Sequence, residues 1–170
     1  MLRNHNNIDE IDRRIIEILQ ANPSISHSEI GKRINKSQPT IGMRLRKLEE
    51  SGIFKYQAGI NLKSFDLALV RIDLETTDPV MIEKIVNQCP FMINVLRLSG
   101  VFNLSILMVG FTLKELEKII NCHFRKNPKV NKLVMNVITD VPNDFIIPLN
   151  FDFEGCCCLD NKCQNKFCEK

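Results

Sequence analysis

The stretch SEIGKRINKSQPTIGMRLRKLEESGIFKYQA, residues 28–58, contains signals for two short helices that a single turn separates. Ser26 and Glu29 have the spacing of a capping box, which predicts the start of the first helix. Ser37 can cap the second helix, and Gly52 is typical of a helix end. Two short helices joined by a turn, the second amphipathic and basic, predict a helix-turn-helix.

The second of these helices has two chemically different faces. Ile41, Leu45 and Leu48 recur at helical spacing, which predicts that they are buried. On the other face, lysine and arginine can neutralise phosphates, and polar side chains near the helix N-terminus can meet base edges in the major groove of DNA. The predicted DNA-binding residues are Ser37, Gln38, Thr40, Met43, Arg44 and Lys47. The alternative is a solvated helix in a small bundle.

The rest of the N-terminal segment agrees with a DNA-binding domain. Apolar residues at helical spacing predict a further amphipathic helix over Ile8–Leu19, which Asn22 and Pro23 end. The chain has a formal net charge of +3, yet residues 28–56 carry seven lysines and arginines against three glutamates. A local basic excess on a helical segment indicates a nucleic-acid partner.

From Leu67 onward the hydrophobic period changes, and strands alternate with helices. The order βαββαβ is that of the ferredoxin-like fold, an antiparallel sheet with both helices on one face. The other sheet face requires a cover, and in a small domain a second copy of the chain is the expected one. The predicted strands are 67–76, 92–99, 103–110 and 130–141, and the predicted helices are 79–88 and 113–125.

One more strand is predicted after this pattern, in FIIPLNFDF, residues 145–153. Its aromatic and aliphatic residues alternate, and Pro148 favours a place at a sheet edge. The strand can pair with the same sheet or with a neighbouring subunit.

Five of the seven cysteines lie between Cys156 and Cys168. Four thiolates can close a tetrahedral zinc site or hold an iron–sulfur cluster, and adjacent side chains of an extended segment point to opposite sides. Two alternatives are a disordered, oxidation-prone tail and a disulfide or intersubunit thiol switch. Elsewhere, Cys89 and Cys122 are predicted to be packing residues, and His123 is predicted to be a packing or surface residue rather than a ligand. The predicted metal ligands are Cys156, Cys158, Cys163 and Cys168.

Two further observations concern the location of the protein. No apolar run approaches the ~18 residues that a membrane helix requires, and the polar N-terminus lacks the apolar stretch of a secretory signal. We therefore expect a soluble cytoplasmic protein, in which thiols stay reduced.

Three segments together closely resemble the Lrp/AsnC (feast/famine) transcriptional regulators: IDEIDRRIIEIL, the stretch of residues 28–58, and LSGVFNLSILMVG. The resemblance covers roughly residues 8–141. It implies a DNA-binding regulator of transcription. Members of this family dimerise through the sheet face and often assemble further into octamers, and many of them respond to an amino acid. Arg44 matches the usual arginine of the recognition helix.

The sequence patterns and the resemblance together predict an α+β architecture of three parts. These are a winged-type helix-turn-helix domain at residues 1–60, a ferredoxin-like effector-binding and oligomerisation domain at 61–153, and the cysteine-rich tail at 154–170. Gly100 and Asn103 occupy the effector loop, but the family typically has an aspartate where this chain has Asn103. A neutral amide holds an ammonium group more weakly than a carboxylate does. Gly100 can equally serve only to turn a β-hairpin.

A different class, the siroheme decarboxylases, has a similar architecture, and FNLS at residues 102–105 distantly resembles one of their motifs. However, the chain has no tryptophan, and its three histidines are scattered. No acid–base constellation stands out, so we predict that the protein is not an enzyme. A metal- or redox-sensing interaction protein is the remaining alternative.

Overall fold

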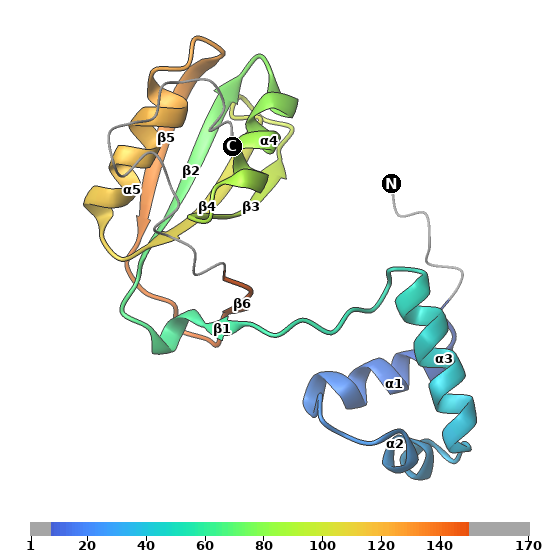
Figure 1. Cartoon of the computed structure of the whole chain (residues 1–170). Coiled ribbons are helices and arrows are strands. Elements are labelled where there is room, and N and C mark those ends of the chain that lie inside the picture. The colour runs from blue at the N-terminus through green and yellow to red at the C-terminus, as the bar shows by residue number, and fades with distance from the viewer. Residues whose placement is uncertain (1–7, 150–170) are drawn as a thin grey trace. The chain divides into compact units, whose positions relative to one another are not determined.

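The computed structural model describes residues 8–149, which fall into two compact units with a boundary between Gln57 and Ala58 (Figure 1). The predicted metal ligands Cys156, Cys158, Cys163 and Cys168 lie outside the described residues. Within residues 8–149, no helix is both long enough and apolar enough to cross a membrane.

The N-terminal unit consists of α1 (Glu10–Ala21), α2 (His27–Ile34) and α3 (Gln38–Glu50). The predicted caps of α2 and α3 are confirmed, because the Ser26 hydroxyl accepts a hydrogen bond from the Glu29 N–H and the Ser37 hydroxyl accepts one from the Thr40 N–H. The two-sided capping box lies instead at α1, where Asp9 and Asp12 each accept from the backbone N–H of the other.

The three helices enclose one small core, and the predicted buried face of α3 is confirmed. Residues 8–57 contain no β-strand, so this described part of the unit has no wing. The core consists of Ile15, Leu19, Ile30, Ile41 and Leu45.

The turn between α2 and α3 is determined by two residues. Asn35 adopts a left-handed conformation with φ of 54°, and the Lys36 N–H then donates to the Gly31 carbonyl at 2.8 Å. A Cβ atom at Gly31 would overlap the Lys36 carbonyl oxygen, so this position accepts only glycine without a backbone shift. The turn is therefore tight, and α3 begins only a few residues after α2 ends.

The C-terminal unit contains the predicted βαββαβ pattern, and its four strands are antiparallel in the order β3-β4-β2-β5. The long predicted helix at 113–125 ends as a regular α-helix at Ile120 and continues as a π-helical turn through Arg125. The elements are β2 (Ala68–Thr76), α4 (Pro79–Gln88), β3 (Met92–Arg97), β4 (Leu104–Gly110), α5 (Leu113–Ile120) and β5 (Val130–Ile138).

The larger core lies between one sheet face and the two helices. Alternate residues of β2 and β4, such as Ile72 and Ile106, are fully buried there against Ile82 of α4 and Leu116 of α5. The prediction that both helices cover one face is therefore confirmed. Burial of each such aliphatic side chain stabilises the fold by about 1.5–3 kcal/mol relative to its exposure.

The strand predicted over 145–153 is present only in part. β6 (Ile146–Ile147) pairs with β1 (Ile60–Asn61) in a separate two-stranded sheet, not with the four-stranded one, and residues 150–153 lie outside the described part of the chain. Two residues suffice for pairing because Asn61 adds side-chain hydrogen bonds to the N–H of Phe145 and to Asp144. Ile147 then packs with Leu62, Leu69 and Val109 on the sheet face that the helices leave uncovered.

Candidate DNA-binding surface and effector loop

Five of the six predicted DNA-binding residues lie at the surface of α3 or at its cap. Gln38, Met43 and Lys47 are exposed, and Met43 retains 67% of its accessible surface. The Ser37 and Thr40 hydroxyl oxygens lie 2.8 Å apart and share one hydrogen bond at the start of the helix. This end of α3 therefore presents polar and apolar groups together.

Arg44, the sixth residue, points toward α1. Its Nη1 donates to Asp9 Oδ2 at 2.6 Å and to Asp12 Oδ1 at 2.8 Å, and its side chain is only 24% exposed. The hydrogen bonds to Asp12 and then Asp9 raise the pKa of Arg44. The N–H of Asp12, and after it Arg44, lower the pKa of the Asp9 carboxyl. Arg44 therefore links the recognition helix to the first turn of α1.

Sequence reasoning did not foresee this ion pair, because its partners lie 32 and 35 positions earlier in the chain. The signal was available in the spacing of Asp9 and Asp12, which places two carboxylates at the start of one helix. It could have been recognised as an arginine-binding pair only once α1 and α3 were known to pack together.

Basic residues outside the predicted set also surround the helix-turn-helix. Lys36 lies in the turn and Arg46 on α3, and both are exposed. Lys32 and Arg33 of α2 are exposed as well, and both lie near Glu29, with nitrogen–oxygen distances of 3.8 and 3.6 Å. Such exposed pairs are weak, so a phosphate can compete for both cations.

The effector loop connects β3 to β4 and contains Gly100 and Asn103. The Asn103 side chain is engaged within the chain: its Oδ1 accepts from the Thr76 N–H at 3.0 Å, and its Nδ2 donates to the Thr76 carbonyl at 2.7 Å. Its own N–H donates to the Leu74 carbonyl. Asn103 thereby joins the loop to the end of β2.

This geometry explains the asparagine in chemical terms. An amide both donates and accepts, so it can match the N–H and the carbonyl of Thr76, whereas a carboxylate could only accept. Gly100 is exposed, and a Cβ there would meet nothing closer than the Phe102 carbonyl at 3.9 Å. The backbone at Gly100 therefore does not require glycine.

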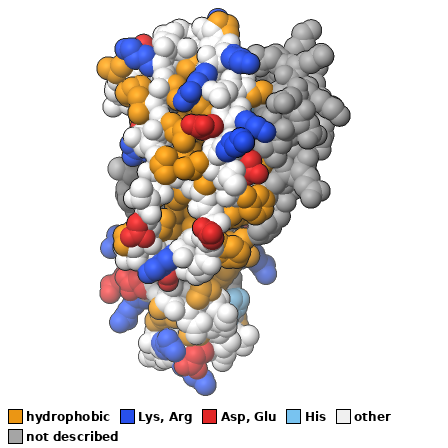
Figure 2. All heavy atoms as spheres, turned by 90° about the vertical axis from the view of Figure 1, so that its left-hand side faces the viewer, with side chains coloured by type: hydrophobic (Ala, Val, Ile, Leu, Met, Phe, Trp, Pro, Cys, Tyr) orange, Lys and Arg blue, Asp and Glu red, His pale blue; other side chains and the backbone are white. Residues whose placement is uncertain are grey.

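The sheet face opposite the helices carries a polar cluster at its centre. Asp73 accepts hydrogen bonds from the Ser105 hydroxyl at 2.7 Å, from Arg71 at 3.1 Å and from Asn136 at 3.2 Å. Cross-strand pairing places exposed Leu96 beside Ser105, in the same row as Asp73. Figure 2 shows one side of the molecule, where hydrophobic side chains likewise lie among basic and acidic ones.

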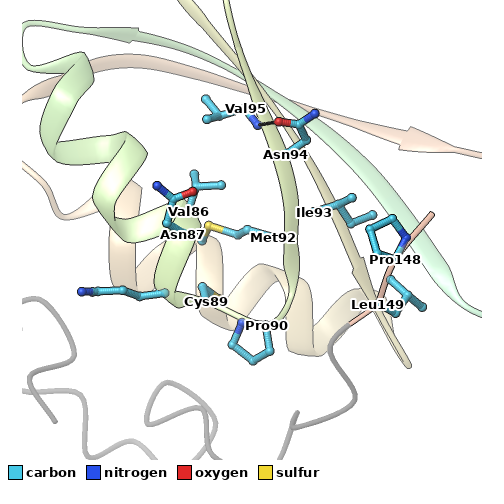
Figure 3. A pocket seen from close by; sticks show the side chains of 11 residues that line it. Val86, Asn87, Cys89, Pro90, Met92, Ile93, Asn94, Val95, Pro148 and Leu149 are labelled. Carbon is cyan, nitrogen blue, oxygen red and sulfur yellow. Dashed lines mark hydrogen bonds between the residues drawn. The ribbon is translucent and has the colours of Figure 1, made fainter. Parts of the chain in front are cut away.

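A pocket of about 430 Å³ lies where α4 ends and β3 begins (Figure 3). Cys89, which follows α4, is buried and lines it together with Met92 and Ile93. Pro148 and Leu149, far along the chain, form another part of its lining.

The predicted packing roles of Cys89 and Cys122 agree with their positions, and of the two roles predicted for His123 the structure favours packing. Cys89 and His123 are buried, and Cys122 packs, partly buried, against the larger core. Within residues 8–149, no group of three or more histidine, cysteine, aspartate or glutamate side chains is arranged to hold a metal ion.

Comparison with known proteins agrees with this architecture. The family model of the AsnC-type helix-turn-helix domain matches residues 8–49. An uncharacterized HTH-type transcriptional regulator of Pyrococcus furiosus is 30% identical over 142 residues, which cover 80% of this chain and 82% of the relative.

Two solved structures share the fold at lower identity. AsnC of Escherichia coli has a TM-score of 0.71 at 19% identity, with 82% of this chain and 97% of AsnC covered. A transcriptional regulator of Neisseria meningitidis, solved in complex with L-methionine, has a TM-score of 0.65 at 19% identity, with coverage of 84% and 97%.

The helix-turn-helix, the sheet domain that follows it and these relatives define the class of helix-turn-helix transcriptional regulators. Within that class, the chain belongs to the Lrp/AsnC family.

Proposed function

We propose that this protein regulates transcription by inserting the N-terminal part of α3 into the major groove of double-stranded DNA. The observation that carries the proposal is the exposed, basic surface around α3 on a unit that matches the AsnC-type helix-turn-helix. A regulator of transcription acts in the compartment that contains the chromosomal DNA. We therefore propose that the protein is cytoplasmic.

The proposed contacts follow from exposure and charge. Gln38, Thr40 and Met43 are the candidates for base edges, and Ser37 for a phosphate near the helix N-terminus. Lys47, joined by Lys36 and Arg46, supplies phosphate contacts. Arg44 acts by holding α3 in place through Asp9 and Asp12, since the same Nη1 atom serves both carboxylates.

A homodimer is the proposed binding unit. The sheet face opposite the helices exposes Leu96 and Val134 in the cross-strand row of Asp73 and Ser105. A second copy would cover these groups, and its two-fold symmetry would present two recognition helices to two half-sites. Further assembly into an octamer is an extension of this proposal.

We also propose that the protein binds an amino-acid effector, but that Asn103 does not contact it directly. The regulator of Neisseria meningitidis was solved with L-methionine, which supports an effector of this kind. Asn103, however, uses both ends of its amide on Thr76, so its proposed role is to shape the loop. Gly100 remains the candidate contact, since it is exposed and nothing crowds it.

The cysteine tail is proposed to hold zinc or an iron–sulfur cluster through Cys156, Cys158, Cys163 and Cys168, and the support is their number and spacing. Metal analysis and the visible spectrum of anaerobically purified protein test it. Zinc without colour or brown iron–sulfur absorbance would support the site, whereas protein that contains neither metal would refute it.

DNA binding is tested by fluorescence anisotropy with duplexes selected from a random library. We expect enrichment of pseudo-palindromic sites and an affinity that falls steeply with salt concentration. Protein that enriches no sequence and binds no duplex at low salt would refute the proposal.

The alternative that the protein is a siroheme decarboxylase-like enzyme is not favoured, because the relatives described above are transcriptional regulators.

A further inference from the structure

The segment that leads out of β6 alternates strictly between buried and exposed side chains. Ile147 is 7% exposed, and Phe145 and Leu149 pack with it against the sheet. Ile146 is 63% exposed, and Pro148 is exposed too. The odd-numbered residues therefore face the protein, as an extended chain requires.

This segment ends at the pocket between α4 and β3. Leu149 and Pro148 line the pocket on one side, and Ile93 and Asn94 of β3 line it on another (Figure 3). β3 is one of the two edge strands of the four-stranded sheet, so the side of it away from β4 has no strand partner among residues 8–149. An edge strand of this kind can pair with an extended segment.

Two aromatic residues follow Leu149 in the sequence. Residues 150–153 read Asn150, Phe151, Asp152 and Phe153, so the alternation of apolar and polar side chains continues. At about 3.3 Å per residue, an extended chain reaches roughly 7 Å from Leu149 by residue 151 and roughly 13 Å by residue 153. A group attached this closely has a local concentration in the millimolar range or above, which a separate ligand rarely reaches.

We propose that Phe151 and Phe153 of the same chain dock in the pocket between α4 and β3, and that residues 150–153 extend along the edge of β3. The pocket volume of about 430 Å³ is within the range of about 300–1,000 Å³ typical of ligand pockets. Docking covers Cys89 and fixes the starting point of the cysteine-rich tail next to the end of α4. This proposal does not depend on DNA binding.

The test compares four proteins by hydrogen exchange of residues 92–97 and by the alkylation rate of Cys89, both measured by mass spectrometry of peptides. They are the full chain, a chain ending at Leu149, Phe151→Ala/Phe153→Ala, and the control Asp152→Ala, whose residue faces outward in the proposed alternation. We expect both rates to rise about tenfold in the truncated chain and in the double variant, but not in the control.

A second measurement guards against general loosening of the fold. A synthetic peptide of residues 150–155, added to the truncated chain at the millimolar concentration that the tether otherwise provides, should restore slow exchange at residues 92–97, while exchange in the central strand β2 stays constant. Rates that are equal in all four proteins, or equally raised by Asp152→Ala, would overturn the proposal. So would protection that disappears on dilution, because the occupant would then be a second copy.

Discussion

Arg44 of α3 donates from Nη1 to Asp12 Oδ1 at 2.8 Å, and the same atom donates to Asp9 Oδ2 at 2.6 Å. Asp12 is the N3 residue of the α1 capping box and is 6% exposed. One guanidinium nitrogen thus connects the recognition helix to the start of the first helix. Removing one member of such a partly buried ion pair leaves the other charge without its partner, which costs more than the intact pair contributes.

Asp12→Ala should lower the free energy of unfolding by about 1–3 kcal/mol, because it removes a charged hydrogen bond and half of a capping box. Denaturant unfolding followed by circular dichroism measures this change. Glu10→Gln, at an exposed carboxylate in the same helical turn, is the control and should change stability little. An equal loss in both variants would contradict the role given to Asp12.

Lys47→Ala should weaken DNA binding and reduce the slope of log affinity against log salt by about 0.9, because one phosphate contact is lost. Salt-series anisotropy measures the slope. Lys118→Ala, at an exposed lysine of α5, should leave the slope unchanged.

Arg44→Ala should lower thermal stability as well as affinity for DNA. An unchanged melting temperature in Arg44→Ala would argue for a direct contact of Arg44 with a phosphate.

Asn103→Asp should destabilise the protein by about 1–2 kcal/mol, because a carboxylate cannot donate to the Thr76 carbonyl. Asn94→Asp is a matched control. The Asn94 Oδ1 atom accepts a hydrogen bond from the Val95 N–H, and a carboxylate oxygen can accept the same bond. Chemical denaturation of both variants is the measurement. If Asn103→Asp were as stable as the control, the loop would not depend on Asn103.

Gly31→Ala should destabilise the helix-turn-helix by about 1–3 kcal/mol, because its Cβ would overlap the Lys36 carbonyl oxygen. Gly42→Ala, on α3, places its Cβ 3.6 Å from His27 Nδ1, an ordinary contact, and should stabilise the helix by about 0.5–1 kcal/mol. Melting temperatures of the two variants should therefore move in opposite directions. A Gly31→Ala variant that melts no lower than the unchanged protein would show that the turn tolerates a side chain.

The ion pair of Glu83 with Arg97 should make stability depend on pH in the acid range. The hydrogen bonds from Arg97 lower the pKa of Glu83 from its ordinary value of 4.5. A lowered folded-state pKa means that this contribution is fully present above about pH 4.5 and is lost as pH falls below it. Unfolding measured from pH 3 to 7 should show a weaker acid dependence in Glu83→Gln, and parallel curves would contradict this.

Local signals in the sequence were sufficient for most of the fold. The caps at Ser26 and Ser37 depend on neighbours three residues away, and the βαββαβ order depends on periodicity within each segment. The orientation of Arg44 and the closure of Asn103 on Thr76 depend on partners 27 or more residues distant. No local pattern specifies such contacts, because they exist only after the elements have packed.

The two-residue strand β1 was missed for the same reason. Ile60 and Asn61 show no alternation long enough to indicate a strand, and their pairing with β6 is set by residues more than 80 positions away. The prediction for FIIPLNFDF captured the correct alternation of side chains but not the partner strand.

The pairing of β1 with β6 has a mechanical consequence for the whole regulator. β1 begins two residues after the start of the C-terminal unit, and β6 lies nine residues before Cys156. A force applied to the chain at Leu149 therefore reaches Ile147 and, through the pairing of β6 with β1, Ile60. Gly59 sits under the Ile147 carbonyl at a spacing that leaves no room for a Cβ. The two ends of the described part of this unit are thus joined by one pair of strands, and tension at one end is transmitted to the other.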